Sequence, residues 1–250
     1  MRFLILGVDE GFGRSKPGYT DTIILVSITS PRRKPIMMSI PRDLWISIAG
    51  QEENRICVLY TIAETKENGR GPYAVTAAVS KSFQIPVHHY VLIKMQGLID
   101  LVDSLGGVDV AFSQPLGRYP IRFTHLDGRA ALAFVRDRDE TDDFARMGQA
   151  QLLINAMLER VFTFKTWIKL PRTLNTLKKV VETNISIWKW PWLTFLMLIS
   201  CINGLEGHTI TRAMVYPRIT PQGEQVIEPN WKKIRSLTDL LLSKDGIDDV

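Results

Sequence analysis

Apolar residues in the first part of the chain occur in short continuous blocks, which glycine, proline and charged residues separate. Such blocks are typical of buried β-strands, and they predict strands at Phe3–Val8, Asp21–Thr29 and Pro35–Ile40. A weaker alternation predicts a further strand at Leu44–Ile48. The chain therefore opens with closely spaced strands.

Farther along the chain, apolar residues recur three and four positions apart, which is typical of helices. This spacing predicts helices at Ile56–Glu64, Tyr73–Phe83, Gly97–Leu105, Asp127–Val135, Asp143–Phe162 and Trp231–Leu242. Further strands are expected at Tyr90–Lys94, Val108–Phe112 and Thr209–Tyr216. Because strands and helices intermix, the predicted fold class is α/β or α+β, with helices on both faces of a sheet.

The composition is that of an ordinary globular protein, with 45% hydrophobic and 23% charged residues among 250. The sequence has no internal repeat or clear linker, so one domain over residues 1–250 is favoured over two. The net charge of +5 suits an anionic partner, which can be nucleic acid, an acidic membrane surface or a phosphorylated substrate. The aromatic residues do not interleave with basic ones, so we expect no nucleic acid partner. Cys57 and Cys201 are expected to be buried free thiols.

Two apolar stretches bear on membrane association. Phe3–Val8 is too short to span a bilayer and lacks the layout of a signal peptide. We therefore expect either a cytoplasmic protein or one whose anchor lies outside this chain. Ile187–Ile202 is the most apolar stretch, but Lys189 and Pro191 interrupt it, and about ten clean apolar residues remain against the roughly 20 that a span needs. A buried or partly lipid-facing helix that starts near Pro191 is predicted instead.

Carboxylates and guanidinium groups collect at the ends of the predicted strands. Asp9 and Asp21 each end a strand, and their carboxylates converge if the two strands are neighbours. Arg42 follows Pro41, which stops a strand and directs the arginine away from the sheet. Taken singly, each residue also has a simpler interpretation as a turn, a cap or a surface ion pair.

The segment from Arg136 to Gln151 contains the strongest cluster of candidate residues. Arg136 and Arg138 are two positions apart, so they point the same way in an extended segment. Arg146 lies in the first turn of the next helix, whose N-terminus favours an anion. The alternative is a solvated loop of mixed charge. Arginine forks bind phosphate oxygens and carboxylates suit magnesium, so the pattern indicates a phosphorylated substrate held with a divalent cation.

Taken in order, these motifs resemble the LytR-CpsA-Psr family of cell-wall glycopolymer ligases. The shared pattern covers residues 3 to about 160, with these segments: Gly7–Asp9, Asp21–Leu25, Ser39–Asp43, Leu101–Val110, Leu126–Arg138 and Asp143–Gln151. The resemblance implies an α-β-α sandwich, in which helices flank a mixed central sheet, with a hydrophobic tunnel for a polyprenyl chain. It also implies transfer of a phosphorylated glycan from a polyprenyl-pyrophosphate carrier to a peptidoglycan hydroxyl, outside the cytoplasm and at a membrane surface.

The resemblance also implies roles for individual residues. Asp9 and Asp21 would bind or order Mg²⁺, with one of them as the base, and Arg42 and Arg138 would act with them in catalysis. The residues implied in phosphate binding are Arg42, Arg55, Arg136, Arg138, Arg146 and, in support, Gln151. The helical segments Ile56–Ala63 and Tyr73–Phe83 are candidates to line the tunnel, and plain core is an equally good interpretation of both.

The sequence departs from the family pattern at three positions. Tyr19 and Gln149 stand where the family usually has arginine, and Cys57 stands where it usually has asparagine. Two missing guanidinium groups leave two alternatives open, a polyprenyl-phosphate-binding module with little catalysis and a polyprenyl-pyrophosphate hydrolase. A nucleic-acid-binding protein is a third reading, and it rests on the positive charge alone. Family members carry an N-terminal membrane anchor, which we expect to lie outside this chain.

Overall fold

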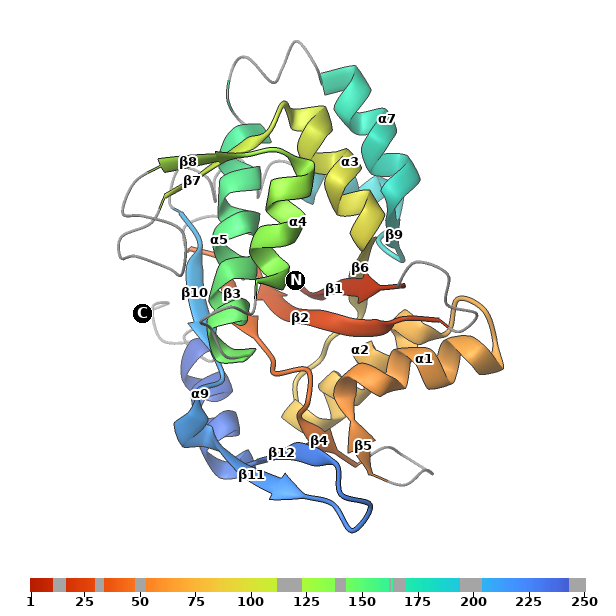
Figure 1. Cartoon of the computed structure of the whole chain (residues 1–250), viewed down its shortest axis with the longest axis vertical. Coiled ribbons are helices and arrows are strands. Elements are labelled where there is room, and N and C mark those ends of the chain that lie inside the picture. The colour runs from red at the N-terminus through yellow and green to blue at the C-terminus, as the bar shows by residue number, and fades with distance from the viewer. Residues whose placement is uncertain are drawn as a thin grey trace, which may run out of the picture.

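The computed structural model describes residues 1–10, 17–29, 34–47, 53–111, 123–137, 143–161, 163, 170–193 and 204–242. Within these residues, the centre of the fold is a six-stranded sheet with the order β10-β3-β2-β1-β6-β9 (Figure 1). Its strands are β1 (Arg2–Asp9), β2 (Tyr19–Ser27), β3 (Ile36–Ser39), β6 (His89–Lys94), β9 (Val181–Thr183) and β10 (Glu206–Thr209). Because β1 pairs antiparallel with β2 and parallel with β6, the sheet is mixed.

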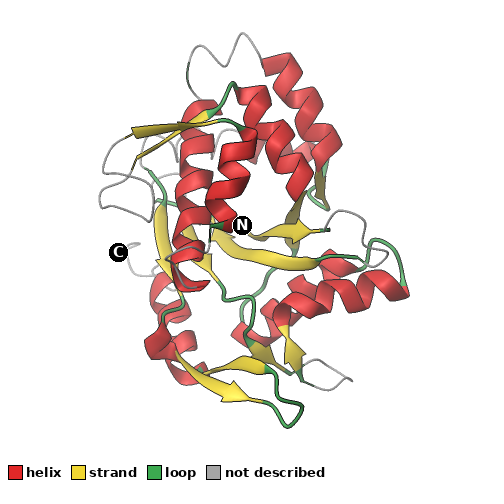
Figure 2. Cartoon of the chain, viewed as in Figure 1, coloured by secondary structure: helices red, strands yellow, loops and turns green. Residues whose placement is uncertain are grey.

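Helices cover both faces of the sheet, as Figure 2 shows. One side carries α1 (Ile56–Lys66), α2 (Gly71–Phe83) and α9 (Trp231–Leu242). The other side carries α3 (Met95–Leu105), α4 (Gly128–Arg136), α5 (Asp143–Val161) and α7 (Leu170–Val180). The predicted sandwich of helices around a central sheet is therefore confirmed.

Short hairpins extend from this centre. They pair β4 (Trp45–Ile46) with β5 (Asn54–Arg55), β7 (Val108–Ala111) with β8 (Phe123–Leu126), and β11 (Val215–Ile219) with β12 (Gln225–Pro229). The described residues also form two short 3₁₀ helices, η1 (Ile187–Lys189) and η2 (Arg212–Met214).

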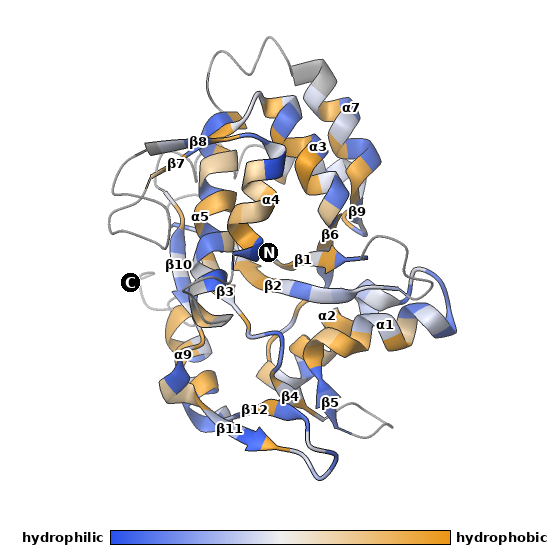
Figure 3. Ribbon diagram, in the orientation of Figure 1, coloured by the Kyte–Doolittle hydropathy of each residue, from blue (hydrophilic) through white to orange (hydrophobic). Residues whose placement is uncertain are grey.

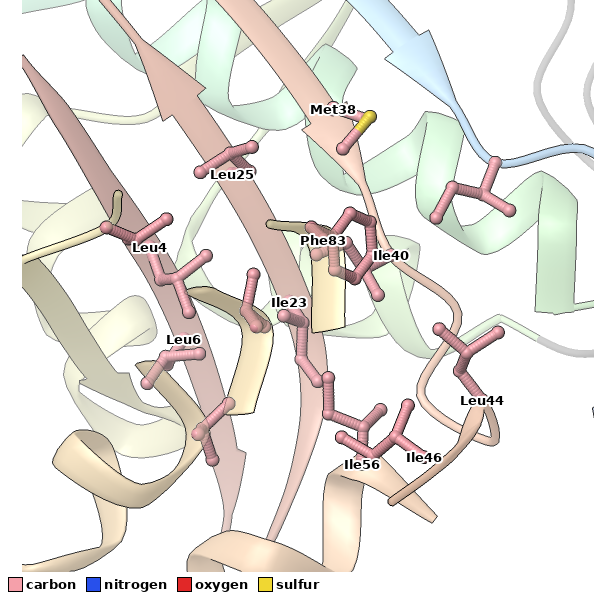
Figure 4. Packing of buried hydrophobic residues seen from close by; sticks show 14 of the residues in the cluster. Leu4, Leu6, Ile23, Leu25, Met38, Ile40, Leu44, Ile46, Ile56 and Phe83 are labelled. Carbon is pink, nitrogen blue, oxygen red and sulfur yellow. The ribbon is translucent and has the colours of Figure 1, made fainter. Parts of the chain in front are cut away.

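The two sides of β1 face different cores, because successive side chains of a strand point to opposite faces. Leu4 and Leu6 are fully buried in the cluster that α1 and α2 cover (Figure 4). Phe3 belongs to a separate cluster on the other face, together with Ala150 of α5. Apolar residues also run along α3, α4 and α5, as Figure 3 shows. The face toward α3 and α5 is the one that carries the candidate site.

Most of the predicted elements are present, and one prediction is wrong. The segment Thr209–Tyr216 is not a single strand, because β10 ends at Thr209, η2 follows and β11 begins at Val215. The two ends of the segment pair with different partners, β3 and β12, so the chain turns between them.

The apolar stretch predicted to begin a helix near Pro191 is only partly described. Residues 190–193 are helical and follow η1, while residues 194–203 lie outside the described residues. No helix in the described part of the chain combines the length and the apolarity that crossing a bilayer requires.

Candidate active site

A polar cavity of about 270 Å³ opens beside the ends of β1, β2 and β3. Its charged lining residues come from five separate segments of the chain: Asp9, Asp21, Arg42, Arg136 and Arg146. All five were predicted from the sequence. The antiparallel register of β1 and β2 sets Asp9 opposite Tyr19, and this pairing brings the two aspartates to one end of the sheet as expected.

Asp9 is held by the end of α4. Arg136 Nη2 lies 2.6 Å from Asp9 Oδ1. The pairing of β1 with β2 shifts register between Gly7 and Val8, just before this aspartate. A Cβ at position 18 would lie 1.9 Å from the carbonyl oxygen of Asp9, so glycine at this position allows the chain to pass close behind the site.

Asp21 is held by Arg42, the arginine that follows the end of β3. Arg42 Nη1 donates a hydrogen bond of 2.9 Å to Asp21 Oδ1, and its Nε lies 3.4 Å from Asp43 Oδ2. Burial lowers the pKa of Arg42, but the hydrogen bond to Asp21 and the charges of both carboxylates outweigh it, so the pKa is raised. Each aspartate of the cavity therefore faces a guanidinium group, which relieves their mutual repulsion.

Arg55 does not line the polar cavity, although the resemblance implied a phosphate contact for it. Its Nη1 lies 3.7 Å from Asp43 Oδ1 and its Nη2 lies 3.5 Å from Glu224 Oε1, in the turn between β11 and β12. Since Asp43 in turn contacts Arg42, Arg55 connects that hairpin to the residues of the site. Arg55 is therefore connected to the site through Asp43 and does not line the cavity itself.

Gln151 also lies away from the cavity lining. Its Nε2 donates to Ser39 Oγ at 2.8 Å and to the carbonyl oxygen of His208 at 2.6 Å. A Cβ at Gly207 would lie 2.5 Å from Gln151 Oε1, so glycine gives the amide room. The side chain therefore ties α5 to β3 and β10, and it reaches the cavity through Ser39, which lines it.

Three further positions singled out in the sequence are Arg138, Gln149 and Tyr19. Arg138 lies outside the described residues. Gln149, which replaces a family arginine, is buried, does not line the cavity, and its Oε1 has no hydrogen-bond partner among the described atoms. Tyr19, which replaces the other, is exposed.

Met95 lines the cavity and was not predicted, because an unbranched apolar residue after a strand carries no chemical signal.

An apolar cavity of about 380 Å³ lies on the same face of the sheet. Its walls come from β1, β6 and β9 and from α3, α5 and α7, and include Phe3, Ile5, Leu98, Ile154, Met157, Leu174, Leu177 and Val181. The polar and the apolar cavity share four lining residues: Thr22, Met95, Val135 and Ala150. The two spaces are therefore adjacent, and these four residues lie where they meet.

Of the two interpretations left open for Ile56–Ala63 and Tyr73–Phe83, core holds, because neither segment lines this cavity. Leu59, Val79 and Phe83 instead pack into the main core on the opposite face of the sheet. Apolar spacing gave equal support to core and to tunnel, and only the topology separates them.

One cation, Lys94, lies in the wall of the apolar cavity, where its hydrogen bond to Glu10 raises its pKa.

The carboxylates of the cavity fit one mode of magnesium binding. Within the described residues, no group of three or more His, Cys, Asp or Glu side chains could hold a metal ion by itself. Mg²⁺ commonly takes one or two carboxylates and completes its shell with water and substrate phosphate. Asp9 and Asp21, which both line the cavity, fit that mode of binding and no mode that depends on protein ligands alone.

A model described as the LytR_cpsA_psr family matches residues 1–239 of the chain. The chain belongs to this family. TagU of Oceanobacillus iheyensis, a polyisoprenyl-teichoic acid–peptidoglycan teichoic acid transferase, is 32% identical over 195 residues, which are 76% of this chain and 60% of TagU. TagV of Bacillus subtilis, named as a transferase of the same kind, is 27% identical over 252 residues, with 93% of this chain and 62% of TagV covered. The chain thus spans about 60% of the length of these relatives.

Solved structures show the same fold. The crystal structure of B. subtilis TagV matches with a TM-score of 0.74 at 24% identity, and the match covers 97% of each chain. A structure of TagT bound to LI-WTA matches with a TM-score of 0.73 at 20% identity, covering 99% of this chain and 91% of TagT. The mixed sheet between helices is therefore an architecture that this chain shares with TagV and TagT.

Proposed function

We propose that this chain carries the catalytic part of a phosphotransferase, which moves a phosphorylated glycan from a polyprenyl-pyrophosphate carrier to a hydroxyl of peptidoglycan. The names of TagU and TagV describe transfer of teichoic acid between a polyisoprenyl carrier and peptidoglycan. Membership of the same family supports this class of reaction for the chain.

The observation that carries the proposal is the contact between two cavities of opposite character. A prenyl pyrophosphate is an amphiphile whose charged end follows directly on an apolar chain. The apolar cavity suits the chain, the arginine-lined cavity suits the pyrophosphate, and the four shared residues lie where the two parts of such a molecule would join.

The arginines are the main binding groups for the phosphates. Arg42, Arg136 and Arg146 line the polar cavity, and guanidinium groups bind phosphate oxygens through two parallel hydrogen bonds. Phosphoryl transfer depends mostly on positioning and on stabilisation of charge. Fixed cations around the transferred group supply both.

Asp9 and Asp21 would hold Mg²⁺ together with the substrate phosphates. A bound magnesium ion supplies charge neutralisation at the phosphate oxygens. The ion pairs with Arg136 and Arg42 fix where the two carboxylates stand before any ligand arrives. Arg138 is included among the catalytic residues on the strength of the family motif alone.

In the proposed reaction, the oxygen of the acceptor hydroxyl forms a bond to the phosphorus atom nearest the glycan. The bond from that phosphorus to the bridging oxygen breaks, and polyprenyl phosphate leaves with the bridging oxygen. The hydroxyl proton passes to a carboxylate of the cavity, Asp9 or Asp21. The products are a glycan phosphodiester of peptidoglycan and polyprenyl phosphate.

The test uses a short-chain prenyl-pyrophosphate glycan and a soluble peptidoglycan fragment, with both products measured by mass spectrometry. We expect equal amounts of phosphodiester and prenyl phosphate with Mg²⁺, and a rate that falls at least about a hundredfold in Asp21→Asn. Asp239→Asn, an exposed position on α9, is the matched control and should keep the wild-type rate.

The other outcomes identify the alternatives. Prenyl phosphate without phosphodiester would make the chain a polyprenyl-pyrophosphate hydrolase. Tight binding of the carrier without any turnover would make it a binding module, as the loss of arginine at Tyr19 and Gln149 suggests. Either result would overturn the transferase proposal.

The proposal implies an extracytoplasmic location, since peptidoglycan lies outside the cytoplasmic membrane. Protease added to intact protoplasts should therefore digest the protein. Protection from the protease until the cells are lysed would contradict it.

A further inference from the structure

Two tryptophans beside the apolar cavity are exposed to solvent. Trp188 is 89% exposed and Trp192 is 52% exposed. Exposed apolar groups that lie together mark binding surfaces. We call Trp188 and Trp192 the tryptophan patch.

The chain places this patch next to the cavity wall. Trp190 and Leu193, which alternate with the patch residues along the sequence, line the apolar cavity. In a helical segment, residues three or four positions apart share a face. Trp190 and Leu193 thus face the cavity, while Trp188 and Trp192 are exposed to solvent.

A further apolar residue of the cavity wall is also exposed. Leu174 of α7 lines the cavity and is 45% exposed. Apolar surface therefore continues from the interior of the cavity to the outside of the protein, on two segments of the chain. The apolar cavity, which would hold a prenyl chain, is therefore bordered at the protein surface by apolar side chains.

The charge around this border is positive. Between Leu170 and Leu193 the chain has four basic residues and one acidic residue: Arg172, Lys178, Lys179, Lys189 and Glu182. Lys178, Lys179 and Lys189 are exposed. The Glu182 carboxylate lies 3.5 Å from Lys94 Nζ, so its charge is partly balanced already.

We propose that the tryptophan patch and these lysines dock the protein on the surface of a lipid bilayer that contains anionic lipids. Tryptophan favours the interface of a membrane, where its ring is in apolar surroundings and its N–H is hydrated. Lysines beside such an apolar surface add attraction to anionic head groups. The inference rests on the proposed function for its purpose, since docking there would let a prenyl chain pass between the bilayer and the cavity.

Co-sedimentation of the full chain with phosphatidylcholine vesicles, with and without phosphatidylglycerol, tests the docking directly. We expect binding that requires phosphatidylglycerol and weakens with salt. The double variant Trp188→Ser with Trp192→Ser should lower the partition coefficient by at least about tenfold, and Lys189→Gln by about fivefold. A blue shift of tryptophan fluorescence on vesicle addition should be lost in the double variant.

Ile219→Ser is the matched control. Ile219 is 69% exposed on β11, at the end of the molecule away from α7 (Figure 1), and its loss should leave vesicle binding unchanged. Wild-type protein that does not sediment with anionic vesicles would overturn the inference, and so would a double variant that sediments as well as the wild type. A patch whose loss changes only the oligomeric state would be a contact between copies, which also overturns it.

Activity in free solution separates this inference from the proposed function. The double variant should process a short-chain carrier in water at the wild-type rate, but lose activity on a long-chain carrier embedded in vesicles. If no variant or wild type processes any carrier, the proposed function fails while vesicle binding still decides the docking.

Discussion

Arg136 Nη2 lies 2.6 Å from Asp9 Oδ1, and this ion pair joins the end of α4 to the end of β1. The two groups line one cavity with Asp21 and Arg42. An arginine in this position both orients the carboxylate and offers its remaining N–H groups to a phosphate. The pair is therefore a first target for mutation.

Arg136→Ala should reduce glycan transfer at least about a hundredfold, because a cation at the phosphates is lost together with its ion pair to Asp9. The measurement is the initial rate with a short-chain carrier. Arg129→Ala, an exposed arginine on the same helix, should have no effect. Equal rates for the two variants would remove Arg136 from the site.

Gln151→Leu should lower the free energy of unfolding by about 1–3 kcal/mol, because Ser39 Oγ and the His208 carbonyl lose their donor. Gln149→Leu, two residues away, should be neutral or stabilising, since its buried Oε1 already lacks a partner. Urea unfolding of both variants decides the point. A Gln151→Leu variant as stable as the wild type would show that the hydrogen bonds of Gln151 do not stabilise the fold.

Ala150→Leu should narrow the passage between the two cavities, because Ala150 lines both. Long-chain carriers should bind at least about tenfold more weakly, while inorganic pyrophosphate binds as in the wild type. Ala156→Leu is the control, a buried alanine on the same helix that faces a separate apolar cluster. Both variants should be destabilised by about 1–3 kcal/mol from overpacking, so only the effect on the long chain distinguishes them.

Cys57 should be unreactive in the folded protein. Burial, followed by the charge of Asp43, raises the pKa of its thiol from 9.0 to about 12, so the reactive thiolate is scarce at pH 8. Alkylation with iodoacetamide, followed by mass spectrometry of the peptide, should be slow until guanidinium unfolds the chain. Fast alkylation of the folded protein would contradict the burial.

The same shift predicts a dependence of stability on pH. A folded pKa above the unfolded value means that the folded protein binds this proton more tightly. The contribution is complete below pH 9.0 and is lost as the pH rises toward about 12. Cys57→Ala should remove this part of the decline in urea midpoint above pH 9.0, and an unchanged decline would assign it to other groups.

Local patterns predicted the elements well where one face of a helix is clearly apolar. The range Trp231–Leu242 agrees in prediction and structure, with Ile234, Thr238 and Leu241 buried at spacings of three and four. The helix α7 was not predicted, although Pro171 in its first turn and the spacing of Leu170, Leu174 and Leu177 favoured one. Polar residues outnumber apolar ones in Leu170–Val180, so the segment does not stand out as an apolar block.

Tertiary partners could not be predicted in this way. Gln151 bonds to a carbonyl 57 positions away, and Arg55 contacts a carboxylate 169 positions away. The sequence identified both as polar residues near the motifs, but their direction depends on how distant strands and hairpins meet. Residues whose direction follows from the end of one strand, such as Asp9 and Arg42, do line the cavity.

The shared wall of the two cavities has a kinetic consequence. In the proposed reaction the prenyl chain belongs to the leaving group, so the apolar cavity holds the product as firmly as it holds the substrate. Binding that is equal before and after the chemical step does not accelerate that step. Turnover would then be set by departure of the spent carrier, seen as a burst of product in the first cycle followed by a slower steady state.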